Sequence, residues 1–264
     1  DVHPAMAARI QNALGLIRRD QGRWPEAVSH FVIALKYLPA DTTDCLLRPT
    51  ITGNLGEARI HQGRLREARA LFQDAFTTAR SCRGNDAFAS LQLLSLAGVA
   101  RIQGDYKLAR QLAERAERQL REHLGPHHPH SIVALNNLAQ ACAAQGKHRQ
   151  AIAAMERVKD LALKVHGERH PLYSGALSNL GVAYYVQHRY VEAEALLREA
   201  LTLDERTYGL SHPSVVRDLN NLAALLDATN RTDEAQMLLL RALEISRGHP
   251  IILLNPTAKH YELE

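Results

Sequence analysis

Four asparagines recur at matching places along the chain and offer amide groups for hydrogen bonding. Asn137, Asn179 and Asn221 are evenly spaced, and Asn54 lies two such steps before Asn137, to within one residue. An amide both donates and accepts, so a row of them can pair with the N–H and C=O groups of an extended peptide. The same amides could instead bond to neighbouring segments of their own chain. We call these four residues the asparagine row and keep both interpretations open.

The residues expected around the asparagine row are small and apolar in the C-terminal part of the chain. Val182 and Val186 lie three and seven residues after Asn179, which is the spacing of one helix face. Such neighbours leave room for the side chains of a bound peptide. The predicted peptide-binding residues are Asn54, Asn137, Gln140, Asn179, Val182, Tyr185, Val186, Arg217 and Asn221.

A second group of candidate residues is basic and lies in the N-terminal half. Residues 1–124 hold 18 Lys and Arg against 13 Asp and Glu, whereas residues 125–264 hold 14 against 15. Guanidinium groups make two-point contacts with carboxylates, so such a group could bind acidic side chains of a partner. Solvated helix surface is the competing interpretation. The predicted basic groove end comprises Arg9, Arg19, Arg48 and Arg101.

Catalytic and metal chemistry find little support in the residue pattern. The chain has no phosphate-binding loop, no nucleophile elbow and no zinc-protease motif. The histidines within residues 127–130 lack acidic or cysteine ligands at a recognised spacing, and Cys45, Cys82 and Cys142 lack a CxxC pair. We therefore expect no catalytic residue, no metal, no cofactor, and reduced thiols in a cytoplasmic protein.

Nucleic acid and membranes are not expected partners. The net charge of +4 is mild, and basic residues alternate with acidic ones along most of the chain. No apolar run approaches the roughly 20 residues that span a bilayer. The partner predicted by this pattern is a protein or a peptide.

A repeated short motif indicates the secondary structure in which these residues lie. Gln-Gly-Arg and related triplets recur along the whole chain, as at residues 21–23 and 62–64. Each triplet is followed by an alanine, five residues after its central residue, and we call these the reference alanines. Their near-constant spacing is typical of a repeat protein. The reference alanines are Ala27, Ala68, Ala109, Ala151, Ala193 and Ala235.

Each period contains two apolar stripes at helical spacing. In the fourth period the first stripe runs through residues 135–142 and the second through residues 151–158. Gly146 lies between them and can adopt the left-handed conformation that ends a helix. Small residues such as Gly56 and Gly181 recur in the first stripe and allow close approach of the second helix. The pattern predicts antiparallel helix pairs joined by short turns.

This order of residues resembles the tetratricopeptide repeat. The match is seen in the small residue of the first helix, the glycine turn, the reference alanine, a bulky residue four positions on and an alanine seven positions on: Gly15, Gly22, Ala27, Phe31 and Ala34. The 42-residue period, with its recurrent His-Pro and Asn-Asn pairs, is similar to the kinesin-light-chain type. The resemblance implies an all-α fold, a right-handed superhelical α-solenoid of about six helix-turn-helix repeats. Its first helices would line a concave groove.

The resemblance covers residues 4–248, which we expect to form a single solenoid. The tail, residues 249–264, breaks the period, and Pro256 stops a further helix. We expect this tail to cap the last repeat, to dock in a groove of its own or a neighbouring copy, or to be disordered. The expected repeats are approximately residues 4–40, 46–82, 86–124, 128–167, 170–208 and 212–248.

The predicted function is a non-enzymatic protein–protein interaction scaffold that binds a peptide or partner segment in the concave groove. The alternative is a regulatory or sensor segment of a larger signalling ATPase or protease. The absence of a methionine at the first position, which is Asp1, favours this alternative. Self-association through the solenoid ends or the tail is also expected, because exposed ends can pair.

Overall fold

Twelve α-helices make up the part of the chain that the structure describes, which is residues 4–38, 44–82 and 86–248 of a computed structural model. No strand occurs in these ranges. The helices are α1 (Pro4–Asp20), α2 (Trp24–Tyr37), α3 (Leu47–His61), α4 (Leu65–Ser81), α5 (Asp86–Ile102), α6 (Tyr106–Leu124), α7 (His130–Ala143), α8 (His148–His166), α9 (Pro171–Val186), α10 (Tyr190–Tyr208), α11 (Pro213–Ala228) and α12 (Thr232–Gly248).

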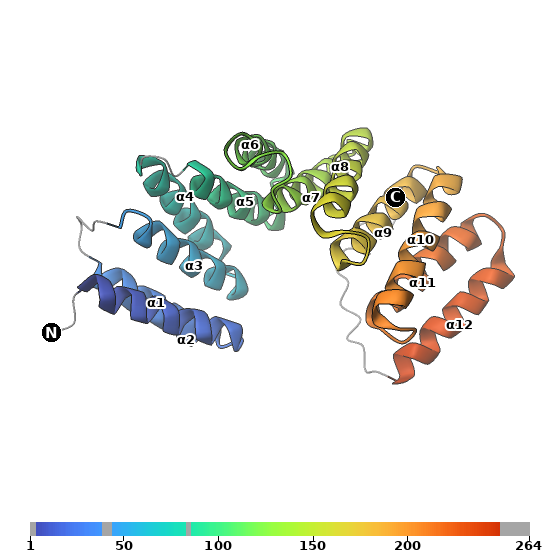
Figure 1. The fold of residues 1–264 in the computed structure, drawn as a ribbon, viewed down its shortest axis with the longest axis horizontal. Helices are drawn as coiled ribbons and strands as arrows, with labels where there is room; N and C mark the ends of the chain where they lie inside the picture. The colour runs from blue at the N-terminus through green and yellow to red at the C-terminus, as the bar shows by residue number, and fades with distance from the viewer. Residues whose placement is uncertain (1–3, 39–43, 83–85, 249–264) are drawn as a thin grey trace. The chain divides into compact units, whose positions relative to one another are not determined.

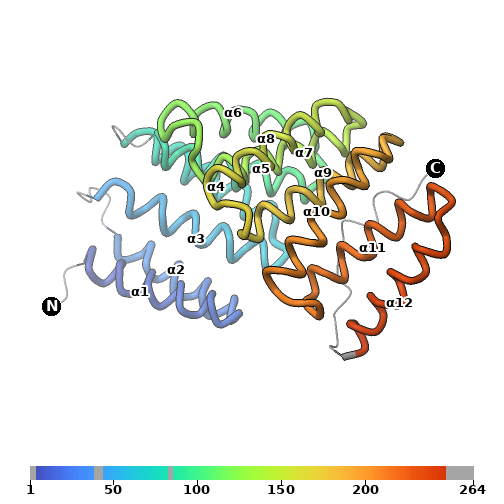
Figure 2. Tube along the Cα trace, turned by 45° about the vertical axis from the view of Figure 1, so that its right-hand side comes forward, coloured from blue at the N-terminus to red at the C-terminus, as the bar shows by residue number. Residues whose placement is uncertain are grey.

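The two helices of a repeat pack as a pair, and within each unit the second helix of a pair also packs on the first helix of the next repeat. The pairs α1 with α2, α3 with α4 and α11 with α12 are seen in Figures 1 and 2. Contacts of α2 with α3, of α4 with α5 and of α10 with α11 continue the stack. The predicted all-α architecture of repeated helix pairs is confirmed.

The turns within the pairs use the left-handed backbone region in every repeat. Gly22, Gly63, Gly104 and Gly146 have φ between 69° and 79°, and the hydrogen bond from Arg23 N to Arg18 O, at 2.9 Å, closes the first turn. His188 and Asn230 occupy the same place in repeats five and six, with φ of 57° and 60°. The sequence motif therefore marks one turn geometry even where its glycine is replaced.

The His-Pro pairs begin the first helices of the later repeats. His170 accepts a hydrogen bond at Nδ1 from the backbone N of Leu172 at 3.2 Å, and His212 accepts one from the backbone N of Ser214 at 3.3 Å. The following proline lies in the first turn, where a missing N–H has no cost. Histidine thus acts as the N-cap, which gives this motif a structural role.

The small residues of the first helices make room for bulky residues of the second helices. A Cβ atom added to Gly15 would lie 2.5 Å from the ring of Phe31, and one added to Gly181 would lie 2.8 Å from Leu197. Phe31 and Leu197 are fully buried. Close approach within a pair is therefore confirmed, and at these glycines it is a contact of backbone with a side chain.

The chain divides into two compact units, residues 1–165 and residues 166–264. Unit 1 holds α1 to α7 and α8 up to Val165, and unit 2 holds α9 to α12. In unit 1 an apolar cluster that includes Phe31 and Ile51 joins α2 to α3. In unit 2 a smaller cluster that includes Val215 and Leu219 joins α11 to its neighbours. Each unit has its own core.

The tail that was expected to form a cap, residues 249–264, lies outside the described residues. Within the described ranges, no helix combines the length and the hydropathy that crossing a membrane requires.

Candidate functional site

The first helices of the repeats lie next to one another within each unit. In unit 1, α1 contacts α3, α3 contacts α5 and α5 contacts α7; in unit 2, α9 contacts α11. We call the accessible side of these helices the first-helix face of each unit. The predicted peptide-binding residues all lie on α3, α7, α9 or α11.

Two members of the asparagine row bond to the neighbouring repeat. Asn54 on α3 donates through Nδ2 to Oδ1 of Asn12 on α1 at 2.9 Å. Asn221 on α11 donates through Nδ2 to Oγ of Ser178 on α9 at 3.1 Å. Asn12 and Ser178 both lie fifteen residues before a reference alanine, so this is one hydrogen bond repeated in both units. These two amides tie successive first helices together.

The other two members of the row differ in their hydrogen bonding. Among the residues that the structure describes, the amides of Asn137 and Asn179 have no hydrogen-bond partner. For Asn137 the residue in the partner position is Leu94, which offers no acceptor. Asn179 is exposed and Asn137 is half-buried, so both amides can reach a ligand.

The predicted neighbours of the row are partly accessible. On α9, Val182, Tyr185 and Val186 are half-buried, and the Tyr185 ring lies 6.1 Å from the ring of Tyr190. Gln140 on α7 is exposed. The face of unit 2 around Asn179 therefore presents an apolar surface next to a free amide.

Two arginines of the predicted basic groove end already pair with acidic side chains of unit 1. Arg9 forms an ion pair with Asp44. Arg19 lies 2.9 Å from Asp20 and 3.2 Å from Glu57. The pKa of the Arg19 guanidinium is raised, because these carboxylates outweigh the lowering effect of burial. Both positive charges are largely compensated within the chain.

The other two arginines of this set have fewer compensating contacts. Arg48 donates to the backbone oxygen of Leu38 at 3.3 Å. Arg101 is half-buried, and within the described ranges its Nε has no hydrogen-bond partner. Neither has an ion pair with a described carboxylate, so these two retain charge for an acidic ligand.

A buried acid cluster lies between α9, α10 and α11 of unit 2. Asp218 is fully buried, and Asp204 is 1% exposed. Arg217 donates through Nε to Asp218 at 3.0 Å and through Nη2 to Asp204 at 3.2 Å. Ser178 donates through Oγ to Asp218 at 2.9 Å, and Asn221 in turn donates to Ser178. Arg217, predicted to bind peptide, is thus held by two carboxylates.

Burial has the largest effect on the pKa of Asp218 in this cluster. It raises the pKa of Asp218 to about 6, against the lowering effect of Arg217 and Ser178. One oxygen of Asp218 and one of Asp204 have no hydrogen-bond partner among the described residues. The sequence analysis missed both carboxylates. Their position in the repeat could have indicated burial, because the equivalent positions between repeats one and two hold the apolar residues Ile51 and Leu38.

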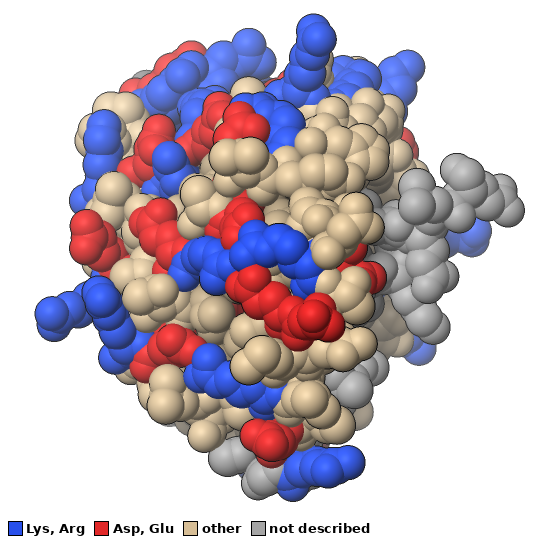
Figure 3. All heavy atoms as spheres, turned by 90° about the vertical axis from the view of Figure 1, so that its right-hand side faces the viewer, with Lys and Arg blue, Asp and Glu red and all other residues tan. Residues whose placement is uncertain are grey.

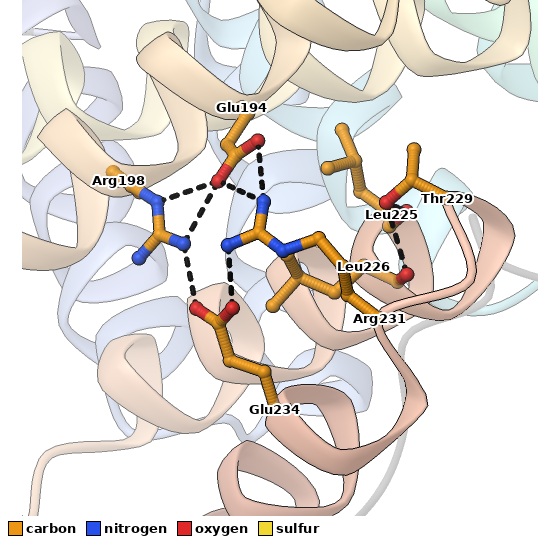
Figure 4. A network of polar contacts seen from close by, with 7 residues as sticks. All are labelled: Glu194, Arg198, Leu225, Leu226, Thr229, Arg231 and Glu234. Carbon is orange, nitrogen blue, oxygen red and sulfur yellow. Dashed lines mark hydrogen bonds and ion pairs between the residues drawn. The ribbon is translucent and has the colours of Figure 1, made fainter.

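A network of exposed ion pairs joins repeats five and six on the second helices (Figure 4). Arg198 on α10 lies 2.7 Å from Glu234 on α12, and Arg231 lies 2.8 Å from Glu194. The contacts raise the pKa of Arg198 and lower that of Glu234, chiefly through hydrogen bonds between the partners. These charges join α10 to the N-terminal end of α12 across the repeat junction.

Unit 1 contains a small pocket of about 140 Å³ between α6, α7 and α8. Glu117, a buried residue that pairs with Arg157, and Ser131 lie in its wall. Pockets for organic ligands are usually about 300–1,000 Å³, so this one is too small for such a ligand.

The thiols and histidines form no reactive constellation in the described residues. Cys82 and Cys142 are buried and Cys45 is exposed. Burial and then the nearby Cys45 raise the pKa of Cys82 to about 11, so its thiol resists ionisation. The rings of His128 and His130 stack 5.3 Å apart. No group of three or more potential metal ligands occurs among the described side chains.

Comparison with protein families gives matches along almost the whole chain. The model of the tetratricopeptide repeat matches residues 6–81, 87–164, 138–203 and 172–248. A comparison with curated protein sequences finds no match.

Solved structures with the same architecture are similar to the chain. BtubC (BKLC) from P. vanneervenii has a TM-score of 0.72 and 20% identity, with 95% of each chain covered. The apo form of RapI has a TM-score of 0.72 and 13% identity, covering 94% of this chain and 65% of RapI. The putative kinesin light chain repeats from Podosopora anserina are 21% identical, with a TM-score of 0.46 and coverage of 95% and 99%. At these identities the likeness to BtubC and RapI concerns the fold.

Proposed function

The chain belongs to the tetratricopeptide repeat family, and from this premise we propose that it is a non-enzymatic scaffold that binds an extended peptide of a partner protein on its first-helix face. Protein interaction is the general role that the family supports. The peptide assignment depends on which polar groups of the face are free.

The unpaired, exposed amide of Asn179 is the observation that carries this proposal. Its neighbours along α9, Val182 and Val186, are half-buried and apolar. A free amide beside an apolar surface suits an extended peptide, whose main chain needs hydrogen bonds and whose side chains need contact area. In unit 1, the free amide of Asn137 offers the same chemistry on α7.

Within this proposal the asparagine row divides into two roles. Asn54 and Asn221 hold successive first helices together through their hydrogen bonds to the neighbouring repeat. Asn137 and Asn179 bind the peptide main chain. Arg217 holds the buried acid cluster, and Arg48 and Arg101 supply positive charge for acidic side chains of the peptide.

The test is a selection of linear peptides from a displayed library against the whole chain, followed by affinity measurements by fluorescence anisotropy. We expect the Asn179→Ala variant to bind the selected peptides about tenfold more weakly, because an interfacial hydrogen bond contributes on the order of 1–2 kcal/mol. Asn220→Ala is the matched control, since Asn220 is an exposed asparagine on α11 outside the proposed site.

Two results would count against peptide binding on this face. One is a library that yields no binding peptide. The other is a set of peptides that binds the double variant Asn137→Ala with Asn179→Ala as tightly as the unchanged chain. Circular dichroism of each variant controls for loss of helix.

A further inference from the structure

The first helix of the chain exposes an apolar side. Ile10 and Ile17 on α1 are 47% and 51% exposed, and Met6, one turn earlier, is also exposed. These three residues follow helical spacing, so they form one stripe. We call Met6, Ile10 and Ile17 the first end face.

The corresponding positions of the later repeats are buried. Ile51 of repeat two lies as far before its reference alanine as Ile10 of repeat one does before its own. Ala58 corresponds to Ile17 in the same way. Ile51 and Ala58 are both fully buried. The residues equivalent to Ile10 in repeats two to six are all at most 8% exposed: Ile51, Gln92, Ala134, Ala176 and Asp218.

The last helix exposes the complementary side. Leu239 on α12 is 49% exposed, and Leu240 and Leu243 beside it are also exposed. Leu239 lies four residues after its reference alanine, where Phe31 and Leu197 are fully buried. We call Leu239, Leu240 and Leu243 the last end face. Figure 3 looks from the side of α11 and α12 and shows positive and negative side chains interspersed with uncharged surface.

Between repeats one and two, the corresponding positions belong to one apolar cluster. Phe31, four residues after its reference alanine, shares one apolar cluster with Ile51 and Ala58 of the next repeat. The same register places Leu239 of one molecule against Ile10 and Ile17 of another. The residues that define the two end faces are apolar and exposed, whereas terminal repeats that remain uncovered need a polar outer face.

We propose that a second copy of this chain covers each end face, with α1 of one molecule packed on α11 and α12 of the next. The occupant is a second copy because each copy carries both faces, in the register that repeats one and two use at their junction. The contact is heterologous, since the two surfaces differ. Association therefore continues head to tail, into a closed ring or an open filament.

The test combines two variants in a sedimentation experiment on the whole chain. Ile10→Glu with Ile17→Glu removes the first end face, and Leu239→Glu with Leu243→Glu removes the last. We expect the unchanged chain to gain mass with concentration and each variant to stay monomeric. An equimolar mixture of the variants retains one intact face of each kind, so we expect a one-to-one dimer and nothing larger.

The matched control is Val191→Glu, which places the same charge at an exposed valine outside both faces and should leave association unchanged. If a glutamate pair reduces helicity, the corresponding serine pair replaces it. An unchanged chain that stays monomeric at every concentration overturns the proposal, and so does a mixture that fails to pair. Deleting residues 249–264 should not reduce association; a monomer that begins to associate only after this deletion would show that the tail covers the last end face.

Discussion

The junction between repeats one and two differs chemically from the junction between repeats five and six. Seventeen residues before the reference alanine, unit 1 has Ile51 and unit 2 has Asp218, and both are fully buried. Eleven residues after the reference alanine of the preceding repeat, unit 1 has the buried Leu38 and unit 2 has the buried Asp204. One repeat geometry therefore accepts an apolar pair in one unit and two carboxylates in the other.

The difference depends on the residue next to the buried acid. Arg217 precedes Asp218 and bonds to both carboxylates, whereas the residue in the same place of repeat two is Thr50. The exposed network of Arg198, Glu234 and their partners adds further charge to the unit 2 junction. Ion pairs such as Arg19 with Glu57 also cross the unit 1 junction near its surface, but only the unit 2 junction buries compensated charge.

The largest expected effect comes from placing the unit 2 acid in unit 1. Ile51→Asp should destabilise unit 1 by about 3–5 kcal/mol, because Thr50 cannot compensate a buried charge. Trp24, the only tryptophan of the chain, stacks on His61 at 3.7 Å, so its fluorescence during urea unfolding reports this junction. Ile102→Asp is the control, since Ile102 is an exposed isoleucine of unit 1 that lies outside both end faces. Equal unfolding midpoints for the two variants would contradict the comparison.

The reverse exchange tests whether the buried acid cluster costs stability. Asp204→Leu combined with Asp218→Ile gives unit 2 the apolar pair of unit 1. We expect a gain of about 1–4 kcal/mol, because well-packed apolar residues often replace buried ion pairs favourably while the half-buried Arg217 turns toward water. Hydrogen exchange of the α11 amides measures the change. Faster exchange in the variant would show that the cluster stabilises the unit.

The pH dependence of stability should separate the two units. Because the folded pKa of Asp218 is about 6 and its ordinary value is 3.8, the folded state binds more protons between these values. Stability of unit 2 should therefore fall as the pH rises from about 4 to about 6, by up to about 3 kcal/mol, and stay level above that. Asp218→Asn should lack this contribution, so its stability relative to the unchanged chain should rise over the same window. Parallel urea-midpoint curves for the two proteins would refute this.

The smallest expected effect concerns the turns. Gly63→Ala in unit 1 should cost about 1 kcal/mol through backbone strain alone, since φ is 72° and an added Cβ meets no atom within 4 Å. His188→Gly in unit 2 should gain up to about 1 kcal/mol by relieving the same strain. Thermal unfolding followed by circular dichroism measures both. A loss of stability on His188→Gly would show that the imidazole contact with Tyr190 outweighs the strain.

Much of the architecture follows from the sequence because its causes are local. The turn motif requires a left-handed residue, so Asn230 aligns with Gly22 on the sequence pattern alone, and both have a positive φ. The spacing of the apolar stripes likewise predicts the helices. Which members of the asparagine row are paired could not be predicted from the sequence pattern, because the hydrogen bond of Asn54 depends on a residue of the preceding repeat.

By itself, the sequence determined the helix pairs, their turns and the small residues that let each pair close. Only the tertiary structure decided which polar groups are paired and which are free, as with the paired Asn221 and the unpaired Asn179. It also buried Asp218, which on an isolated helix would face water. The physical reason is that periodicity acts within one helix pair, whereas burial and hydrogen-bond partners are supplied by the neighbouring pair.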